Sequence, residues 1–185
     1  MKNLEEIINK ITPVDQKAME EAWKCWDSLC KPLRGLGWLE EVLVQIAGIY
    51  GTSCPHPDKR AVVIMGADNG VVEEGVTQTD SSVTIQVLEN MGDQLSTACV
   101  MCSLAGCELF PVNIGALTDG RHPRIQNRVV RHGTGNIARG PAMSREECMQ
   151  AVLTGADIVC GLKKEGYNLI VTGEMGIGNT TTSSA

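Results

Sequence analysis

The chain has 185 residues, 43% of them apolar and 21% charged, a size that suits one domain or one domain with a small addition. Sixteen Lys and Arg against 22 Asp and Glu leave a formal net charge of −6, and aromatic residues make up only 3%. This composition argues against nucleic acid and anionic membranes as partners and against an aromatic base-stacking platform. With no recognisable secretory signal and no long apolar run, we expect a cytoplasmic protein whose eight cysteines are thiols.

Two helices are predicted before the first strand. Thr12 is placed to cap the first helix, which we expect to run to about Cys30. The second is expected from about Leu36 to a C-terminal Gly51, because apolar residues recur there at helical spacing. They are Leu36, Leu39, Leu43, Ile46, Ala47 and Tyr50. Residues 1–52 are therefore predicted to form an N-terminal helical segment.

A buried strand and a long helical pattern follow. The apolar run 61–67 is rich in β-branched residues and predicts a strand that ends in the polar residues 68–70. From about Ser82 the pattern is helical, with Gly92 as a potential break. Its apolar stripe consists of Val83, Val87, Met91, Leu95, Ala98, Cys99 and Cys102. Because the two cysteines lie on this stripe and no second pair follows, buried thiols are favoured over a zinc site.

A second strand is predicted over 108–115, and the segment 116–141 that follows it is long and basic. Connections of this length are uncommon inside a compact domain, so we expect a functional loop. Its charged and titratable side chains are Arg121, His122, Arg124, Arg128, Arg131, His132 and Arg139. They either meet a substrate phosphate or form a merely solvated loop.

The remaining elements complete an alternation of strands and helices. Ser144 and Glu147 form a capping box at the start of a helix, and 168–172 is a third strand before a glycine-rich turn. The apolar stripe of this helix consists of Met149, Val152, Leu153, Ala156, Val159 and Cys160. We therefore predict an α/β fold, a Rossmann-like, mainly parallel sheet with helices on both faces. Residues 53–185 would form a nucleotide-binding domain that lacks its C-terminal part.

The glycine-rich turn has the composition of a phosphate-binding loop. Gly176 and Gly178 leave room for backbone N–H groups to approach an anion, and Asn179 and Thr180 add short polar donors. The turn has neither the Gly-Lys-Ser/Thr ending of a Walker loop nor the third glycine of the dinucleotide fingerprint, which disfavours an NTPase or a nicotinamide dehydrogenase. A turn that binds no ligand is the alternative.

Two further polar groups follow strand ends. Glu174 lies at the end of the third strand and residues 68–70 at the end of the first, so a parallel sheet would place them on one edge. Convergence of such loops is what a small-molecule pocket requires. Alternatively, Glu174 is a solvated loop side chain and residues 68–70 are an ordinary turn.

Four stretches of the chain match one family in order. They are Thr12-Pro13-Val14-Asp15 with Leu36-Gly37-Trp38-Leu39-Glu40, Ala67-Asp68-Asn69-Gly70-Val71 with Gly75-Val76-Thr77, Gly133-Thr134-Gly135-Asn136 with Pro141-Ala142-Met143-Ser144, and Gly173-Glu174-Met175-Gly176-Ile177-Gly178-Asn179-Thr180-Thr181. Together they resemble the nicotinate-nucleotide–dimethylbenzimidazole phosphoribosyltransferases, which make the lower-ligand nucleotide of cobalamin. Asn69 departs from this family, which commonly has histidine there.

The resemblance implies transfer of phosphoribose from nicotinate mononucleotide to 5,6-dimethylbenzimidazole or a related base, giving α-ribazole 5′-phosphate and nicotinate. It implies no metal and no cofactor, and typically a homodimer. By matching positions, the phosphate would be held by Gly176, Gly178, Asn179 and Thr180, and the base bordered by Thr77, Gln86 and Met175. Glu174 would lie beside the reacting nitrogen as the candidate catalytic group. Asp68, Asn69, Gly133 and Thr134 are further pocket candidates.

Members of this family are substantially longer, and the glutamate usually assigned as their base lies in a C-terminal part absent here. We therefore expect an N-terminal portion that does not turn over alone. Two alternatives stay open: a non-catalytic module that binds a nucleotide or base, and a structural subunit completed by a partner chain.

Overall fold

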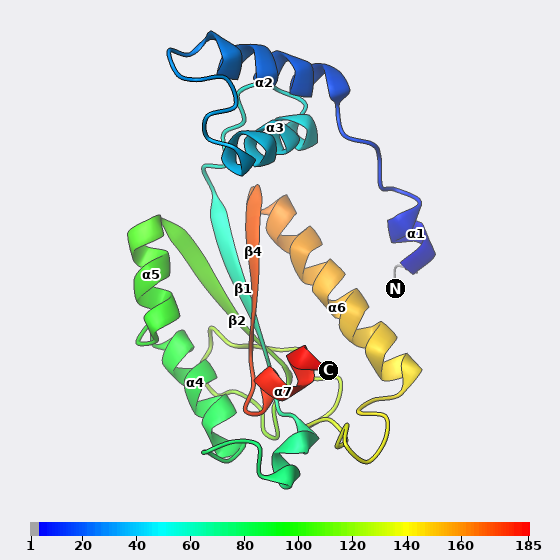
Figure 1. Cartoon of the computed structure of the whole chain (residues 1–185). Coiled ribbons are helices and arrows are strands. Elements are labelled where there is room, and N and C mark those ends of the chain that lie inside the picture. The colour runs from blue at the N-terminus through cyan, green and yellow to red at the C-terminus, as the bar shows by residue number, and fades with distance from the viewer. Residues whose placement is uncertain (1–3) are drawn as a thin grey trace. The chain divides into compact units, whose positions relative to one another are not determined.

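The structure, a computed structural model, describes residues 4–185 as two compact units that divide between Pro57 and Asp58 (Figure 1). The first unit contains α1 (Leu4–Ile8), α2 (Gln16–Ser28) and α3 (Trp38–Tyr50). The second contains β1 (Arg60–Ala67), the 3₁₀ helix η1 (Gly70–Glu74), α4 (Ser82–Gly92), α5 (Thr97–Ala105), β2 (Cys107–Gly115), β3 (Gln126–Asn127), α6 (Arg145–Lys164), β4 (Leu169–Met175) and α7 (Asn179–Ser184). Within the described residues, no helix has the length and apolar character that a membrane span requires.

Of the two predicted ends of the N-terminal helices, the start of the first was wrong and the end of the second is confirmed. Asp15, not Thr12, caps α2, because its Oδ1 accepts a hydrogen bond from the Ala18 N–H at 3.0 Å. The prediction for Thr12 was wrong because α2 begins at Gln16, and the N-cap residue directly precedes the first helical residue. Gly51 does follow α3, with the left-handed φ of 67° that suits glycine.

The predicted stripe of α3 is confirmed in part. Ala47 is buried as expected, together with Val44 and Gly48, whereas Leu36 and Leu39 at the start of the stripe are exposed. Two of these, Val44 and Ala47, pack with Ala22 of α2. Gly48 allows the close approach, since a Cβ there would lie 2.6 Å from Cγ of Met19.

A buried ion pair lies inside this first unit. Glu40 has no exposed surface, its Oε1 accepts from the Leu36 N–H at 2.9 Å, and Lys31 Nζ lies 2.9 Å from the same oxygen. The Leu36 hydrogen bond and then Lys31 hold the pKa of Glu40 below its ordinary value. A depressed carboxyl pKa stabilises the fold above the unfolded value, about 4.3 for Glu, and the contribution is lost as pH falls through the folded value.

We expect acid to destabilise this unit through Glu40. All three tryptophans, Trp23, Trp26 and Trp38, lie in it, so their fluorescence reports its unfolding alone. Titration from about pH 7 to about pH 3 should give a clear acid transition that Glu40→Gln flattens. The exposed neighbour Glu41 provides the control, and Glu41→Gln should keep the wild-type transition. An unchanged transition in Glu40→Gln would mean that another group controls it.

The predicted α/β architecture is confirmed. The sheet has strand order β3-β2-β1-β4 and every pairing is parallel, with Val63 of β1 opposite Phe110 of β2 and Thr172 of β4. Alternate β1 side chains contribute to two cores. One face of the sheet packs against α6 and the other against α4 and α5 (Figure 1). Helices therefore cover both faces of the sheet.

Two predicted helix stripes need correction. The segment from Ser82 is two helices, and Leu95 is 73% exposed because the chain leaves helical geometry after Gly92. Ser96 then caps α5 by accepting from the Cys99 N–H. In α6, Val152 and Val159 are exposed, while the buried residues are Ile158 and Leu162. Cys99 and Cys102 are buried thiols.

The short strand β3 was not predicted from the sequence. This strand has only two residues inside the segment 116–141, and it pairs with Val112 and Asn113 of β2. A pair of residues is too short to carry the alternation by which strands are recognised. The capping box of Ser144 and Glu147 is confirmed.

Candidate functional site

The carboxyl ends of β1, β2 and β4 bring three predicted segments to one edge of the sheet. Residues 68–70 follow β1, residues 116–117 follow β2, and residues 176–178 follow β4. Because the strands are parallel, these loops share the edge at which α/β sheets bind ligands.

The loop after β4 lies directly against the end of β1. A Cβ on Gly176 would lie 2.1 Å from the Ala67 carbonyl oxygen, so only glycine fits there. Asn69 joins the two segments: its Nδ2 donates to the Ile177 carbonyl at 3.1 Å, and its Oδ1 accepts from the Thr182 hydroxyl at 3.3 Å. The amide at position 69 therefore fixes the loop that was predicted to hold phosphate.

The buried hydroxyl of Thr84 supports the same loop from α4. Its Oγ1 accepts the Ile177 N–H at 3.1 Å, and the residue has no exposed surface. Thr84 was not among the predicted site residues, although a threonine between the apolar positions of an amphipathic helix is a recognisable signal.

Glu174 and Asn179 are in contact. Glu174 is the penultimate residue of β4 and is exposed, and its Oε1 accepts a hydrogen bond from Asn179 Nδ2. The candidate catalytic carboxylate and one predicted phosphate residue are thus coupled. Gly178, with φ of 85°, directly precedes Asn179 and the start of α7, while Thr180 is exposed.

The candidates for the base pocket are less closely gathered. Met175 packs against the core that contains Ile64 and Leu88. Thr77 is half-buried in the loop after η1, and Gln86 is exposed on α4. Within residues 4–185, no hydrogen bond joins Thr77 or Gln86 to the loop after β4.

Asp68 is a buried junction between three segments. It is 2% exposed, and its Oδ2 accepts from the Leu117 N–H at 2.8 Å. Its backbone N–H donates to Gly115 and its carbonyl accepts from Thr134. Oδ1 is buried and has no hydrogen-bond partner in the described part of the chain. Asp68 therefore positions the loops rather than facing an open pocket.

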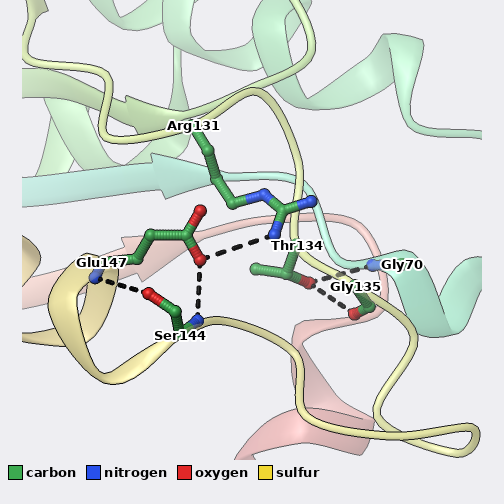
Figure 2. Close-up of polar contacts among 6 residues, drawn as sticks. All are labelled: Gly70, Arg131, Thr134, Gly135, Ser144 and Glu147. Atoms are coloured by element: carbon green, nitrogen blue, oxygen red, sulfur yellow. Dashed lines mark hydrogen bonds and ion pairs between the residues drawn. The ribbon is translucent and has the colours of Figure 1, made fainter.

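Thr134 fastens the segment 116–141 to the end of β1 (Figure 2). Its hydroxyl accepts from the Gly70 N–H at 3.1 Å and donates to the Gly135 carbonyl at 3.0 Å. A Cβ on Gly70 would lie 2.6 Å from the Thr134 carbonyl oxygen, so the two backbones touch. Gly133, with φ of 73°, donates its N–H to Gly115.

Thr134→Val should destabilise the chain by about 1 kcal/mol, because it removes the hydroxyl and leaves the Gly70 N–H without its acceptor. Hydrogen exchange should also quicken at Gly70 and Gly135. Thr154→Val is the matched control, since that hydroxyl only bonds back to Gln150 along the exposed face of α6. Equal urea midpoints for the wild type and Thr134→Val would show that the Thr134 hydroxyl does not stabilise the fold.

Two arginines of the basic segment already have carboxylate partners. Arg131 Nη1 lies 3.5 Å from Glu147 Oε2, which also accepts the Ser144 N–H (Figure 2). Arg139 lies 2.9 Å from Glu74 and 3.4 Å from Glu73. These pairs hold the segment against α6 and η1 and leave less positive charge for a phosphate.

A small cavity lies beneath the Arg131–Glu147 pair. Its volume is about 80 Å³, and it opens between the ends of β1 and β2 and the start of α6. Gly133 and Thr134 line it, together with apolar side chains such as Ile114 and Met143. Among residues 4–185, no group of three or more His, Cys, Asp or Glu side chains is placed to hold a metal ion.

Comparison with known proteins gives a consistent result. Residues 11–185 match the model of the DBI_PRT family, described as phosphoribosyltransferase. The chain is 43% identical over 185 residues to the nicotinate-nucleotide–dimethylbenzimidazole phosphoribosyltransferase of Clostridium tetani, covering 100% of this chain and 51% of that protein. It is 46% identical over 181 residues to the protein of that name in Ruminiclostridium cellulolyticum, covering 98% and 51%.

A solved structure agrees. The nicotinate-nucleotide–dimethylbenzimidazole phosphoribosyltransferase of Thermus thermophilus superposes with a TM-score of 0.84 at 38% identity, covering 90% of this chain and 51% of that one. The chain spans about half the length of the curated relatives it matches.

Proposed function

The chain belongs to the DBI_PRT phosphoribosyltransferase family, and we propose that its protein transfers phosphoribose from nicotinate mononucleotide to 5,6-dimethylbenzimidazole or a related aromatic base. The products are α-ribazole 5′-phosphate and nicotinate, the nucleotide step of the lower-ligand branch of cobalamin synthesis. The observation that carries the proposal is the convergence of Asn69, Glu174 and Gly176 at one sheet edge, in a chain 43% identical to a relative of that name.

The proposed reaction is a displacement at the anomeric carbon of the ribose. The incoming benzimidazole nitrogen forms the new C–N bond as the bond to nicotinate breaks, and the benzimidazole proton passes to a base. Glu174, at the end of β4, would lie beside the reacting nitrogen as the candidate catalytic carboxylate, and Gly176, Gly178, Asn179 and Thr180 would hold the 5′-phosphate. Thr77, Gln86 and Met175 would border the base. No step uses a metal or a cofactor.

We propose further that residues 53–185 form the nucleotide-binding part and that the protein acts in the cytoplasm as a homodimer. The family resemblance supports the nucleotide-binding part and the homodimer. Light scattering coupled to gel filtration measures the oligomeric state directly, and a monomeric mass at micromolar concentration would contradict the dimer.

The test of the function is a transfer assay. The longest available form of the protein, in excess over nicotinate mononucleotide and with dimethylbenzimidazole present, should release nicotinate and form α-ribazole 5′-phosphate, both resolved by chromatography. Omission of dimethylbenzimidazole is the control. Binding of the mononucleotide without nicotinate release would instead indicate a non-catalytic nucleotide-binding module, and absence of binding would overturn the proposal.

A further inference from the structure

A second cavity lies at the opposite edge of the sheet. Its volume is about 700 Å³, within the range of small-molecule sites, and all of its lining belongs to the second unit. Residues at the amino ends of β1 and β2 and residues of α5 line it. Because Gly176 and Asn69 lie at the carboxyl ends of the strands, this cavity is separate from the proposed transfer site.

The cavity lining carries three cationic and two anionic side chains. The cations are Lys59, Arg60 and Arg124 and the anions are Asp58 and Glu108, and Glu108 accepts a hydrogen bond from the Tyr167 hydroxyl. That hydrogen bond, followed by burial, raises the pKa of Tyr167 to about 12, so the phenol keeps its proton and stays bonded to the carboxylate. A lining with one more cation than anions, in a chain of net charge −6, favours an anionic occupant.

Arg60 has an unsatisfied donor at the centre of this edge. It is the first residue of the central strand, opposite Cys107 of β2 and Leu169 of β4. Its Nε is buried and has no hydrogen-bond partner, and none of the ion pairs within residues 4–185 involves Arg60 or Arg124. A buried guanidinium donor without an acceptor is costly, and phosphate oxygens are well-matched acceptors.

The cavity also has apolar lining. Met91, Val100, Leu104 and Leu109 contribute to it, and Leu104 is 86% exposed. A ligand that fills the cavity therefore needs an apolar or aromatic body beside its anionic group. Lys59 already donates to the Glu165 carbonyl at 2.7 Å. The two guanidinium groups of Arg60 and Arg124, which form no ion pair in the described residues, suit the dianion of a phosphate monoester better than a single carboxylate.

We propose that this cavity binds a small phosphate monoester with an apolar or aromatic body, and that Arg60 contacts the phosphate. This site is additional to the proposed transfer site. Lys59 and Arg124 contribute charge at the opening, where both side chains are exposed.

Fluorine NMR of 3-fluorotyrosine-labelled chain tests the site. The chain has two tyrosines: Tyr167 lines the cavity and Tyr50 lies in the first unit, so Tyr50 is an internal control. Phenyl phosphate should shift the Tyr167 resonance saturably without moving that of Tyr50, and benzoate should bind more weakly. Arg60→Gln should weaken phenyl phosphate binding roughly tenfold or more, whereas Arg128→Gln, outside the cavity lining, should not.

Circular dichroism checks that each variant is folded. If Arg60→Gln fails to fold, Arg124→Gln tests the same charge from an exposed position and should weaken binding as well. A Tyr167 resonance that stays fixed at millimolar phenyl phosphate would overturn the proposal, as would wild-type affinity in the folded cavity variant. Binding at the loop after β4 alone leaves Tyr167 unmoved and is therefore also a negative result.

Discussion

Gly176→Ala is expected to weaken binding of nicotinate mononucleotide by about a hundredfold or more, because it displaces the loop proposed to hold the phosphate. The new Cβ would lie 2.1 Å from the Ala67 carbonyl oxygen and 2.9 Å from Asn69 Nδ2. The first of these contacts is with backbone of the central strand, so no change of rotamer relieves it. Loss of two phosphate hydrogen bonds at about 1.5–3 kcal/mol each accounts for a change of that size.

The same substitution should also destabilise the fold by about 1–3 kcal/mol, as overpacking of a tight contact does. Calorimetry measures the binding and urea unfolding measures the stability. Gly161→Ala is the matched control, because a Cβ there has open space in α6 and alanine favours the helix by about 0.5–1 kcal/mol. Wild-type affinity in Gly176→Ala would place the phosphate elsewhere.

Glu174→Gln is expected to slow phosphoribosyl transfer about a hundredfold or more while leaving the fold intact. Glutamine keeps the Oε1 that accepts from Asn179, but it loses the charge and basicity needed to take the benzimidazole proton. Since the side chain is exposed, the free energy of unfolding should change by less than about 0.5 kcal/mol. Binding of nicotinate mononucleotide should be nearly unchanged.

Single-turnover release of nicotinate, with the longest available form of the protein in excess over its substrate, measures this effect even when the rate is low. Glu21→Gln, on the exposed side of α2, makes the same chemical change away from the sheet and should leave the rate unaltered. An unchanged rate in Glu174→Gln would remove this carboxylate from the chemistry.

The strands of the sheet were predictable because their signals are local. Residues 61–67, 108–115 and 168–172 read as apolar, β-branched runs, and they correspond to β1, β2 and β4 within a few residues. The start of α6 was equally clear, since Ser144 and Glu147 satisfy each other's backbone N–H groups without help from the rest of the fold.

The buried helix faces were less predictable. Apolar spacing identifies an amphipathic segment, but tertiary packing decides which of several apolar positions is buried. Leu95 continued the stripe of the segment from Ser82, yet the helix ends before it and the side chain is exposed. Val152 fits the period of α6 and is exposed, whereas Ile158 packs on the sheet.

In the candidate site, too, some features were predictable from the sequence and others were not. Parallel topology was enough to place residues 68–70 and 174–180 at one edge. Contacts between residues far apart in sequence were not predictable, among them Thr84 supporting Ile177 and Asp68 buried beneath Leu117. The local positive charge of 116–141 likewise gave no sign that Arg131 and Arg139 have carboxylate partners.

We propose that a nucleotide phosphate binds at the carboxyl edge of the sheet, between the ends of β1 and β4. Titration of the ¹⁵N-labelled chain with nicotinate mononucleotide tests it most directly, because each backbone amide reports its own surroundings. We expect saturable shifts of the amides of residues 176–180 and of the Asn69 side chain, and we expect these shifts to be lost in Gly176→Ala. Binding that leaves those amides unmoved, or no binding at millimolar nucleotide, would contradict it.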